Sequence, residues 1–248
     1  MSEPANPAIS PTPPAPALYL LPVPLSDGAP ADCCITAYER RVIAGLRHFI
    51  VENVRSARRF LRKVDPGFPI DESSFTVLDE HSRTADVPAM LEPLSRGIAM
   101  GVISEAGCPA VADPGADAVA VAQARGYRVV PLVGPSSILL ALMGSGFNGQ
   151  NFAFAGYLPV DAAARQKRLR EMEGRVRREH QTQIFIETPY RNNRLIGELT
   201  KSLPATMKLC VASDVTGPRE SITTRTLGRW AKSAYDYDKI PTIFLIGE

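Results

Sequence analysis

Short apolar runs alternate with segments of helical periodicity along the first half of the chain. Leu18–Leu21 predicts a first strand, and apolar residues then recur at helical spacing from Ile35 to Ile50. Strands that alternate with helices at this interval are typical of parallel βαβ units in a doubly wound sheet. The same pattern predicts further strands near 49–51, 75–78, 98–104 and 127–133, and helices near 55–64, 87–95 and 116–125.

The alternation restarts after residue 133, where Gly134 and Pro135 interrupt the pattern at a strand end. We therefore predict an α/β fold of two α/β domains with mainly parallel sheets, 18–133 and 134–248. Residues 1–17 carry a proline-rich run and are predicted to be a flexible tail. In the second domain the pattern predicts helices near 136–143, 162–178 and 192–203, and strands near 152–154, 183–187, 207–212 and 242–246.

Composition narrows the function classes. The four cysteines form no CxxC pair and the three histidines are scattered, so we expect no metal site. No apolar run approaches the roughly 18 residues that span a bilayer, and the N-terminus lacks a signal-peptide pattern, so we expect a cytoplasmic protein without a membrane segment. Residues 1–131 hold 12 Lys and Arg against 15 Asp and Glu, whereas 132–248 hold 16 against 11. The basic second half permits an anionic partner.

One turn carries most of the chemical information. The segment SEAGCP, Ser104 to Pro109, follows an apolar strand and precedes a helix. Ligands of open α/β sheets bind at such turns beyond the carboxyl ends of strands, and small residues let a ligand approach the backbone. The turn is neither a GxGxxG dinucleotide loop nor a GxxxxGK[ST] phosphate loop. A tight connection without a ligand would explain a single turn of this kind equally well.

Three further turns of small residues lie at predicted strand ends. Ser136 and Ser137 follow Gly134-Pro135, Glu187 begins the segment ETPYR, and Thr242 follows Pro241. Ser136 or Ser137 could equally cap the following helix. Four such turns across two domains favour a ligand site more than any one of them does.

These segments resemble the tetrapyrrole-methylase superfamily of S-adenosylmethionine (SAM)-dependent methyltransferases, and within it the branch that acts on small-subunit ribosomal RNA. The resemblance rests on SEAGCPAVADPG, VGPSS, SGF, FAGYLP and ETPYR, in this order. Three segments depart from the family pattern. The first-strand loop reads VPLSD instead of TPIGN, the EDTR segment reads ENVR, and the RELTK segment reads SDVTG.

The resemblance implies a methyltransferase, a SAM cofactor in a cleft between the two domains, and a homodimer. A ribose hydroxyl needs a base to take its proton, and the candidate catalytic residues are Glu105, Glu52 and Arg55. Asp113 could equally cap the next helix, and Glu52 could pair with Arg55. The resemblance places the following residues at the cofactor: Pro24, Ser104, Glu105, Ala106, Gly107, Ser136, Ser137, Glu187 and Thr242.

Two basic stretches bear on the substrate, one from Arg55 to Lys63 and one from Arg165 to Arg178. They could neutralise RNA phosphates, or they could be solvated helix faces. We expect ribosomal RNA or the small ribosomal subunit as the partner and 2′-O-methylation of a ribose as the reaction. One alternative is methylation of a tetrapyrrole or another small molecule. Another is a homologue that binds SAM or RNA without catalysis.

Overall fold

The computed structural model describes residues 13–248 and divides into two compact units. Unit 1 comprises the chain up to Pro24 and Ala29–Pro135, and unit 2 comprises Leu25–Gly28 and Ser136–Glu248. Most of the predicted flexible tail, residues 1–12, lies outside the described residues. Ala17 is already fully buried in the core of unit 1. Each unit has its own sheet and its own buried clusters.

The sheet of unit 1 is entirely parallel, as the alternating pattern predicts. All residues of its adjacent strands β1 and β4 are buried, which is typical of strands covered on both faces. The five strands are β1 (Leu18–Leu21), β2 (His48–Val51), β3 (Ser74–Val77), β4 (Met100–Ile103) and β5 (Val129–Pro131), in the order β3-β2-β4-β1-β5.

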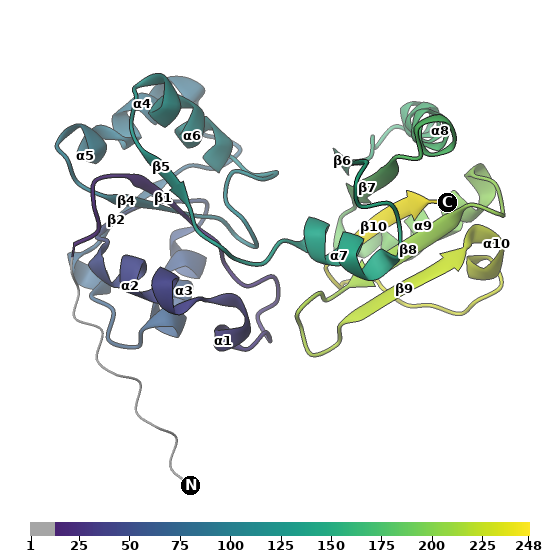
Figure 1. Cartoon of the computed structure of the whole chain (residues 1–248), viewed down its shortest axis with the longest axis horizontal. Coiled ribbons are helices and arrows are strands. Elements are labelled where there is room, and N and C mark those ends of the chain that lie inside the picture. The colour runs from purple at the N-terminus through teal and green to yellow at the C-terminus, as the bar shows by residue number, and fades with distance from the viewer. Residues whose placement is uncertain (1–12) are drawn as a thin grey trace, which may run out of the picture. The chain divides into compact units, whose positions relative to one another are not determined.

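Helices cover both faces of this sheet (Figure 1). Because side chains alternate along a strand, Tyr19 and Leu21 join one buried cluster while Leu18 and Leu20 join the other. The first cluster includes α2 (Ala37–Gly45) and α3 (Val54–Val64), and the short α1 (Ala31–Cys34) precedes them. The second includes α4 (Val87–Met90), α5 (Glu92–Ser95) and α6 (Gly115–Ala124).

The helix predicted over 87–95 is two one-turn helices, because Pro88 and Pro93 each start a new turn and cannot donate a backbone hydrogen bond.

At the other end of unit 1, Gly134 passes so close to Pro22 that a Cβ there would collide with the proline ring. Short 3-10 turns complete the described chain: η1 (Ile70–Glu72), η2 (Thr84–Asp86) and η3 (Pro189–Arg191).

The connections of unit 1 diverge around β4. The chain leaves β1 and β2 toward the face of α2 and α3, but it leaves β4 toward the face of α6. Since β4 lies between β1 and β2, their carboxyl ends border a point where the chain direction switches. Open α/β sheets bind ligands at such switch points.

Unit 2 confirms the α/β class, but its sheet is mixed. Only β6 and β7 are parallel; β10 pairs antiparallel with β7 and β8, and β8 pairs antiparallel with β9. The reason is that β8 and β9 form a hairpin and the final strand inserts beside β7. The strands are β6 (Phe152–Tyr157), β7 (Thr182–Ile186), β8 (Lys208–Ser213), β9 (Ser221–Thr226) and β10 (Thr242–Gly247), in the order β6-β7-β10-β8-β9.

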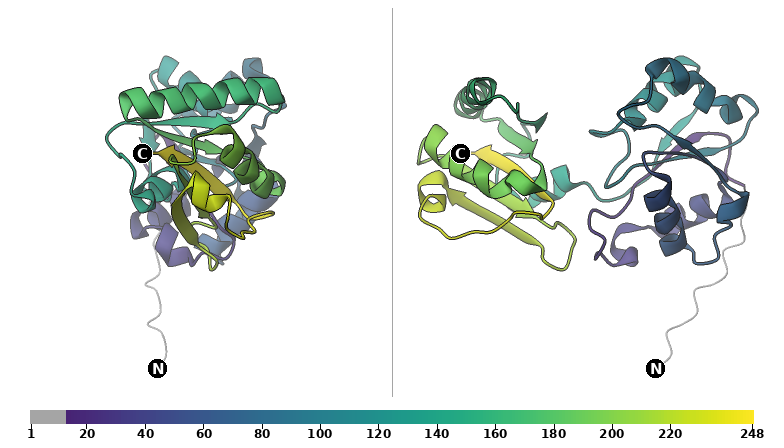
Figure 2. Two further views of the ribbon diagram at one scale, coloured as in Figure 1. Left: turned by 90° about the vertical axis from the view of Figure 1, so that its right-hand side faces the viewer. Right: turned by 180° about the vertical axis from the view of Figure 1, so that it is seen from behind.

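Two buried clusters lie on the two faces of this sheet. One includes α8 (Ala162–Glu179), α9 (Asn192–Ser202) and α10 (Leu227–Trp230), and the other includes α7 (Ser137–Ser145). The long helix α8 is seen side-on in the left view of Figure 2. In the described part of the chain, no helix is long and apolar enough to cross a membrane.

Candidate functional site

The turns after β1 and β4 are joined at the carboxyl edge of the first sheet. The Val23 amide donates to the Gly107 carbonyl at 2.9 Å, and the Gly107 amide donates back at 3.1 Å. Gly107 has a φ of +74°, a conformation that favours glycine. Pro24 therefore lies next to the segment Ser104 to Gly107. The cofactor role expected of these residues stays a prediction.

A network of carboxylates extends this edge to β2. The Glu52 Oε1 accepts a hydrogen bond from the backbone amide of Glu105 at 3.0 Å. The Glu105 carboxylate accepts one from the hydroxyl of Ser56, in the first turn of α3. The structure thus brings Glu52 and Glu105 together. Arg55 follows Glu52 closely in the chain and is exposed, but among the described residues it forms no ion pair with Glu52.

The environment of Glu52 raises the pKa of its carboxyl. Burial raises the pKa of this carboxyl above its usual value, and the nearby carboxylates of Asp113 and Glu105 raise it further. The hydrogen bond from the Glu105 amide opposes this by lowering the pKa. A carboxylate whose pKa lies nearer neutrality binds a proton more strongly than a free glutamate does.

Asp113 shapes the turn that leads into α6. Its Oδ1 accepts hydrogen bonds from the amides of Ala110, at 2.9 Å, and Gly115, at 2.7 Å. The N-cap position of α6 is Pro114 and has no side-chain cap, so Asp113 fixes the turn just before the helix and is not its N-cap. Its Oδ2 is buried and has no hydrogen-bond partner within the described residues. Ala110 and Ala112 have positive φ angles of 67° and 63°, which are costly for residues other than glycine.

This turn borders a cavity of about 10 Å³, which is at the lower limit for holding one water molecule. Glu52, Ser104 and Asp113 are among the residues that line it. Carboxylates dominate this edge, since the charges of Asp113 and Glu105 both act on Glu52. Such an edge fits a cofactor with net positive charge, as the sulfonium and ammonium of SAM provide. It would repel a phosphorylated cofactor.

The other predicted cofactor residues belong to unit 2, and their cofactor roles stay predictions. Ser136 caps α7, its Oγ accepting from the Leu139 amide at 3.5 Å, and Ser137 begins that helix. Thr242 begins β10 and donates to the Ile240 carbonyl at 2.9 Å. Glu187 accepts from the Thr188 amide at 2.7 Å and pairs with Arg191 at 2.8 Å.

The predicted basic stretches are only partly available to a substrate. Arg165 is buried and pairs with Glu198, while Arg168 and Arg177 pair with glutamates of their own helix. In the first stretch, Arg58 lies over the ring of Phe75. The second stretch therefore combines structural ion pairs with a solvated face.

Some residues at the corresponding edge of unit 2 were missed by the sequence reasoning. Tyr157 and Tyr190 are exposed by 62% and 75%, and both lie where a parallel strand ends. Arg194, one helical turn beyond Arg191, lines a pocket there. The available signals were the motifs ETPYR, which contains Tyr190, and FAGYLP, which contains Tyr157.

The chain is similar over most of its length to curated methyltransferases. It is 34% identical over 212 residues to Ribosomal RNA small subunit methyltransferase I of Mesorhizobium japonicum, covering 86% of this chain and 68% of that protein. It is 30% identical over 208 residues to the protein of the same name from Vibrio cholerae, covering 84% and 68%. No protein-family model matches the chain.

Solved structures share the fold at low sequence identity. The methyltransferase CobJ aligns with a TM-score of 0.62 and 16% identity, covering 94% of both chains. Uroporphyrin-III C-methyl transferase from Thermus thermophilus, complexed with S-adenosyl homocysteine, aligns with a TM-score of 0.57 and 15% identity, covering 94% of this chain and 92% of that one. These structures confirm the fold predicted from the motifs. With relatives of 30 and 34% identity across more than four fifths of its length, the chain belongs to the ribosomal RNA small subunit methyltransferase I family.

Proposed function

We propose that this protein is a SAM-dependent methyltransferase that methylates the 2′-hydroxyl of a ribose in small-subunit ribosomal RNA. The observation that carries the proposal is the similarity to two rRNA methyltransferases over more than four fifths of the chain. The joined turns of unit 1 support it, because they form an acidic edge at a switch point where a cationic cofactor fits.

Residues of unit 1 would bind and orient the cofactor. The backbone of Ser104 to Gly107 and the adjoining Pro24 offer small side chains and a fixed turn against which SAM can lie. When bound, SAM supplies an activated methyl group on its sulfonium. The remaining work of the protein is to align the ribose oxygen with that methyl group, and such alignment contributes on the order of 7–11 kcal/mol.

Glu105 is the residue that we assign to the proton of the ribose hydroxyl. Its side chain is exposed, and the Ser56 hydroxyl holds it at the start of α3. Glu52 is half-buried behind it and binds its backbone amide, so Glu52 is a positioning residue. We assign the exposed Arg55 to an RNA phosphate near the reacting ribose.

Methyl transfer to ribosomal particles tests the proposal. Small subunits from cells that lack the protein are incubated with the enzyme and SAM carrying a radiolabelled methyl group. Subunits from cells that contain the protein are the matched control. We expect label in the rRNA of the deficient subunits alone, at a 2′-O position located by nuclease mapping. Label in neither, with SAM binding intact by calorimetry, contradicts the rRNA assignment.

The relatives in the solved structures favour a tetrapyrrole as the second candidate substrate, on the fold alone. A parallel reaction with uroporphyrinogen III distinguishes the two, since label in the macrocycle would replace the rRNA assignment. Calorimetry that detects no SAM binding would exclude both reactions. The small ribosomal subunit of a bacterium is a cytoplasmic particle, so the proposal includes a cytoplasmic location. A homodimer stays a prediction from the family.

A further inference from the structure

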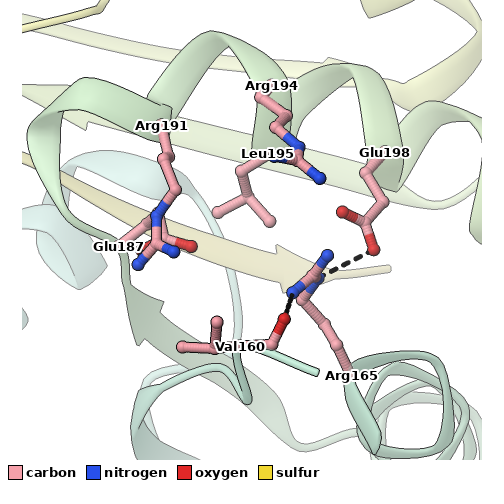
Figure 3. Close-up of a pocket in the computed structure, with 7 residues that line it drawn as sticks. All are labelled: Val160, Arg165, Glu187, Arg191, Arg194, Leu195 and Glu198. Atoms are coloured by element: carbon pink, nitrogen blue, oxygen red, sulfur yellow. Dashed lines mark hydrogen bonds and ion pairs between the residues drawn. The ribbon is translucent and has the colours of Figure 1, made fainter. Parts of the chain in front are cut away.

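Unit 2 contains a polar pocket at the carboxyl ends of its two parallel strands (Figure 3). Its volume is about 190 Å³, and it lies where α8 and α9 begin. All of its lining residues belong to unit 2. Its lining consists of Val160, Arg165, Glu187, Arg191, Arg194, Leu195 and Glu198.

Arg165 forms a fixed wall of this pocket. Its Nε pairs with the Glu198 carboxylate at 2.8 Å, and its Nη1 donates to the carbonyls of Pro159 and Val160 at 2.9 and 2.7 Å. The side chain is 10% exposed. With three of its five N–H donors bonded internally and little of its side chain exposed, Arg165 holds the lining in shape.

Arg191 uses only some of its hydrogen-bond donors within the protein. Its Nη2 pairs with Glu187 at 2.8 Å, and its Nε donates to the Thr188 hydroxyl at 3.0 Å. The side chain is still 37% exposed, and its remaining donors face no partner among the described residues. It can therefore add a hydrogen bond to a ligand without breaking its ion pair.

Arg194 is the group that makes the pocket cationic. It is exposed and has no hydrogen bond or ion pair among the described residues. Figure 3 shows it extending from α9 over the lining between Arg191 and Glu198. Two of the three arginines are matched by glutamates, so Arg194 leaves one positive charge uncompensated. An anion is the ligand that this charge balance favours, and a guanidinium matches the oxygens of a phosphate in pairs.

The volume limits how much of a ligand can enter. Pockets that enclose drug-sized molecules measure about 300–1,000 Å³. The pocket is smaller, so it suits a single phosphate group and not a whole nucleoside cofactor.

Exposed aromatic residues close in the chain to the lining residues favour RNA as the source of that phosphate. Tyr190 precedes Arg191 and is 75% exposed, Tyr157 ends β6 and is 62% exposed, and Val160 is 73% exposed. Single-stranded RNA is recognised where aromatic rings can stack on unpaired bases beside cations that contact the backbone.

We propose that this pocket binds one backbone phosphate of single-stranded RNA through Arg194, assisted by Arg191, with Tyr190 and Tyr157 offering stacking surfaces to the neighbouring bases. The proposal rests on the proposed function for the choice of RNA. It adds a substrate subsite built from residues of unit 2, in which Glu187, a residue that the resemblance places at the cofactor, serves through its ion pair with Arg191.

Equilibrium binding to a fluorescent single-stranded RNA that carries a small-subunit rRNA segment tests the subsite. The full chain is compared with Arg194→Ala and with Lys201→Ala. The latter removes a positive charge from the exposed end of the same helix, outside the pocket. A charge-assisted hydrogen bond contributes about 1.5–3 kcal/mol, so we expect Arg194→Ala to weaken binding about tenfold or more. We expect Lys201→Ala to change it less than twofold.

Salt dependence and a rescue variant separate a direct contact from general charge. Loss of one phosphate contact lowers the slope of log K against log salt by about 0.7, and Arg194→Lys restores most of that slope. Equal losses in Arg194→Ala and Lys201→Ala would overturn the subsite, as would wild-type protein that binds no RNA. Arg194-dependent binding of a porphyrin polycarboxylate in place of RNA would also overturn it. The binding readout needs no methyl transfer, so an inactive enzyme with Arg194-dependent RNA binding contradicts the proposed reaction and leaves the subsite standing.

Discussion

Glu39 is buried although its sequence pattern predicts a glutamate at the surface of a helix start. Thr36 and Glu39 form the TxxE pattern of a capping box at the start of α2, and the Thr36 hydroxyl accepts from the Glu39 amide at 3.0 Å. The Glu39 side chain is nevertheless fully buried, and neither carboxylate oxygen forms a hydrogen bond of good geometry. Burial raises the pKa of this carboxyl to about 7, although the Thr36 backbone and the charge of Arg40 lower it in part.

This burial predicts a stability that falls as the pH rises. The pKa in the folded protein is about 7 against 4.5 for a free glutamate, so between these values the folded protein holds a proton that the unfolded chain releases. The free energy of unfolding should fall by up to about 3 kcal/mol from pH 4.5 to pH 7 and then level off, as far as this group is concerned. Urea unfolding of the wild type and of Glu39→Gln at pH 5 and pH 8 measures it. The free energy of unfolding of Glu39→Gln, relative to that of the wild type, should be higher at pH 8 than at pH 5. Parallel pH profiles of the two proteins would contradict the prediction.

Glu105 carries the prediction for catalysis. Glu105→Gln keeps the size of the side chain but removes the proton acceptor. We therefore expect the rate of methyl transfer to fall by about 10²- to 10⁴-fold, the range typical of general-base catalysis. Single-turnover kinetics measure the transfer step, and calorimetry of SAM binding shows whether the cofactor still binds. Glu179→Gln, at the exposed end of α8, is the control and should keep full activity. A rate for Glu105→Gln within threefold of the wild type would exclude this residue as the base.

At the scale of elements, periodicity identified most strands and helices but not how every strand pairs. The strand β9 was missed because the segment SITTRT is half-buried throughout, at the edge of its sheet, and shows no alternation. The final strand was predicted, but its antiparallel place between β7 and β8 was not. Apolar content reports burial, whereas strand direction depends on contacts between residues far apart in sequence.

The candidate site shows the same limit. The turn from Ser104 to Gly107 was recognisable because its small residues follow a strand and match a family motif. Its pairing with Glu52 arises because β2 lies next to β4, which one sequence does not reveal. The pocket around Arg194 could not be predicted from the sequence for the same reason, because it combines residues from three elements and the loops between them.

The cap of α3 supplies a prediction at this scale. Asn53 stands where the family has an acidic residue, and its Oδ1 accepts from the amides of Arg55 and Ser56 at 2.8 and 3.4 Å. Asn53→Ala should lower the free energy of unfolding by about 1 kcal/mol, whereas Asn53→Ser should retain most of it. The same turn holds the Ser56 hydroxyl against Glu105, so Asn53→Ala should also slow methyl transfer. Urea unfolding and the transfer assay are the two measurements. A free energy of unfolding of Asn53→Ala equal to that of the wild type would show that the cap contributes nothing.

At the scale of the whole molecule, the two halves of the sequence carry net charges of opposite sign. Residues 1–131 have a net charge of −3 and residues 132–248 a net charge of +5. The acidic carboxylate edge belongs to the first part, and the cationic pocket belongs to the second. A cationic cofactor and a polyanionic substrate would thus each meet the part of the chain with the opposite charge.

The two ligands should therefore respond differently to salt. Binding of single-stranded RNA releases counterions, so log K should fall linearly with log salt, by about 0.7 for each phosphate contacted. SAM brings few charges and displaces no counterion atmosphere, so its affinity should change less than threefold between 50 and 200 mM salt, on the order expected from screening alone. Fluorescence anisotropy for RNA and calorimetry for SAM, in the same buffers, measure both. An RNA slope near zero would mean that base stacking, not the arginines of unit 2, supplies the affinity. A steep SAM slope would mean that the carboxylates of unit 1 interact with the cofactor at long range.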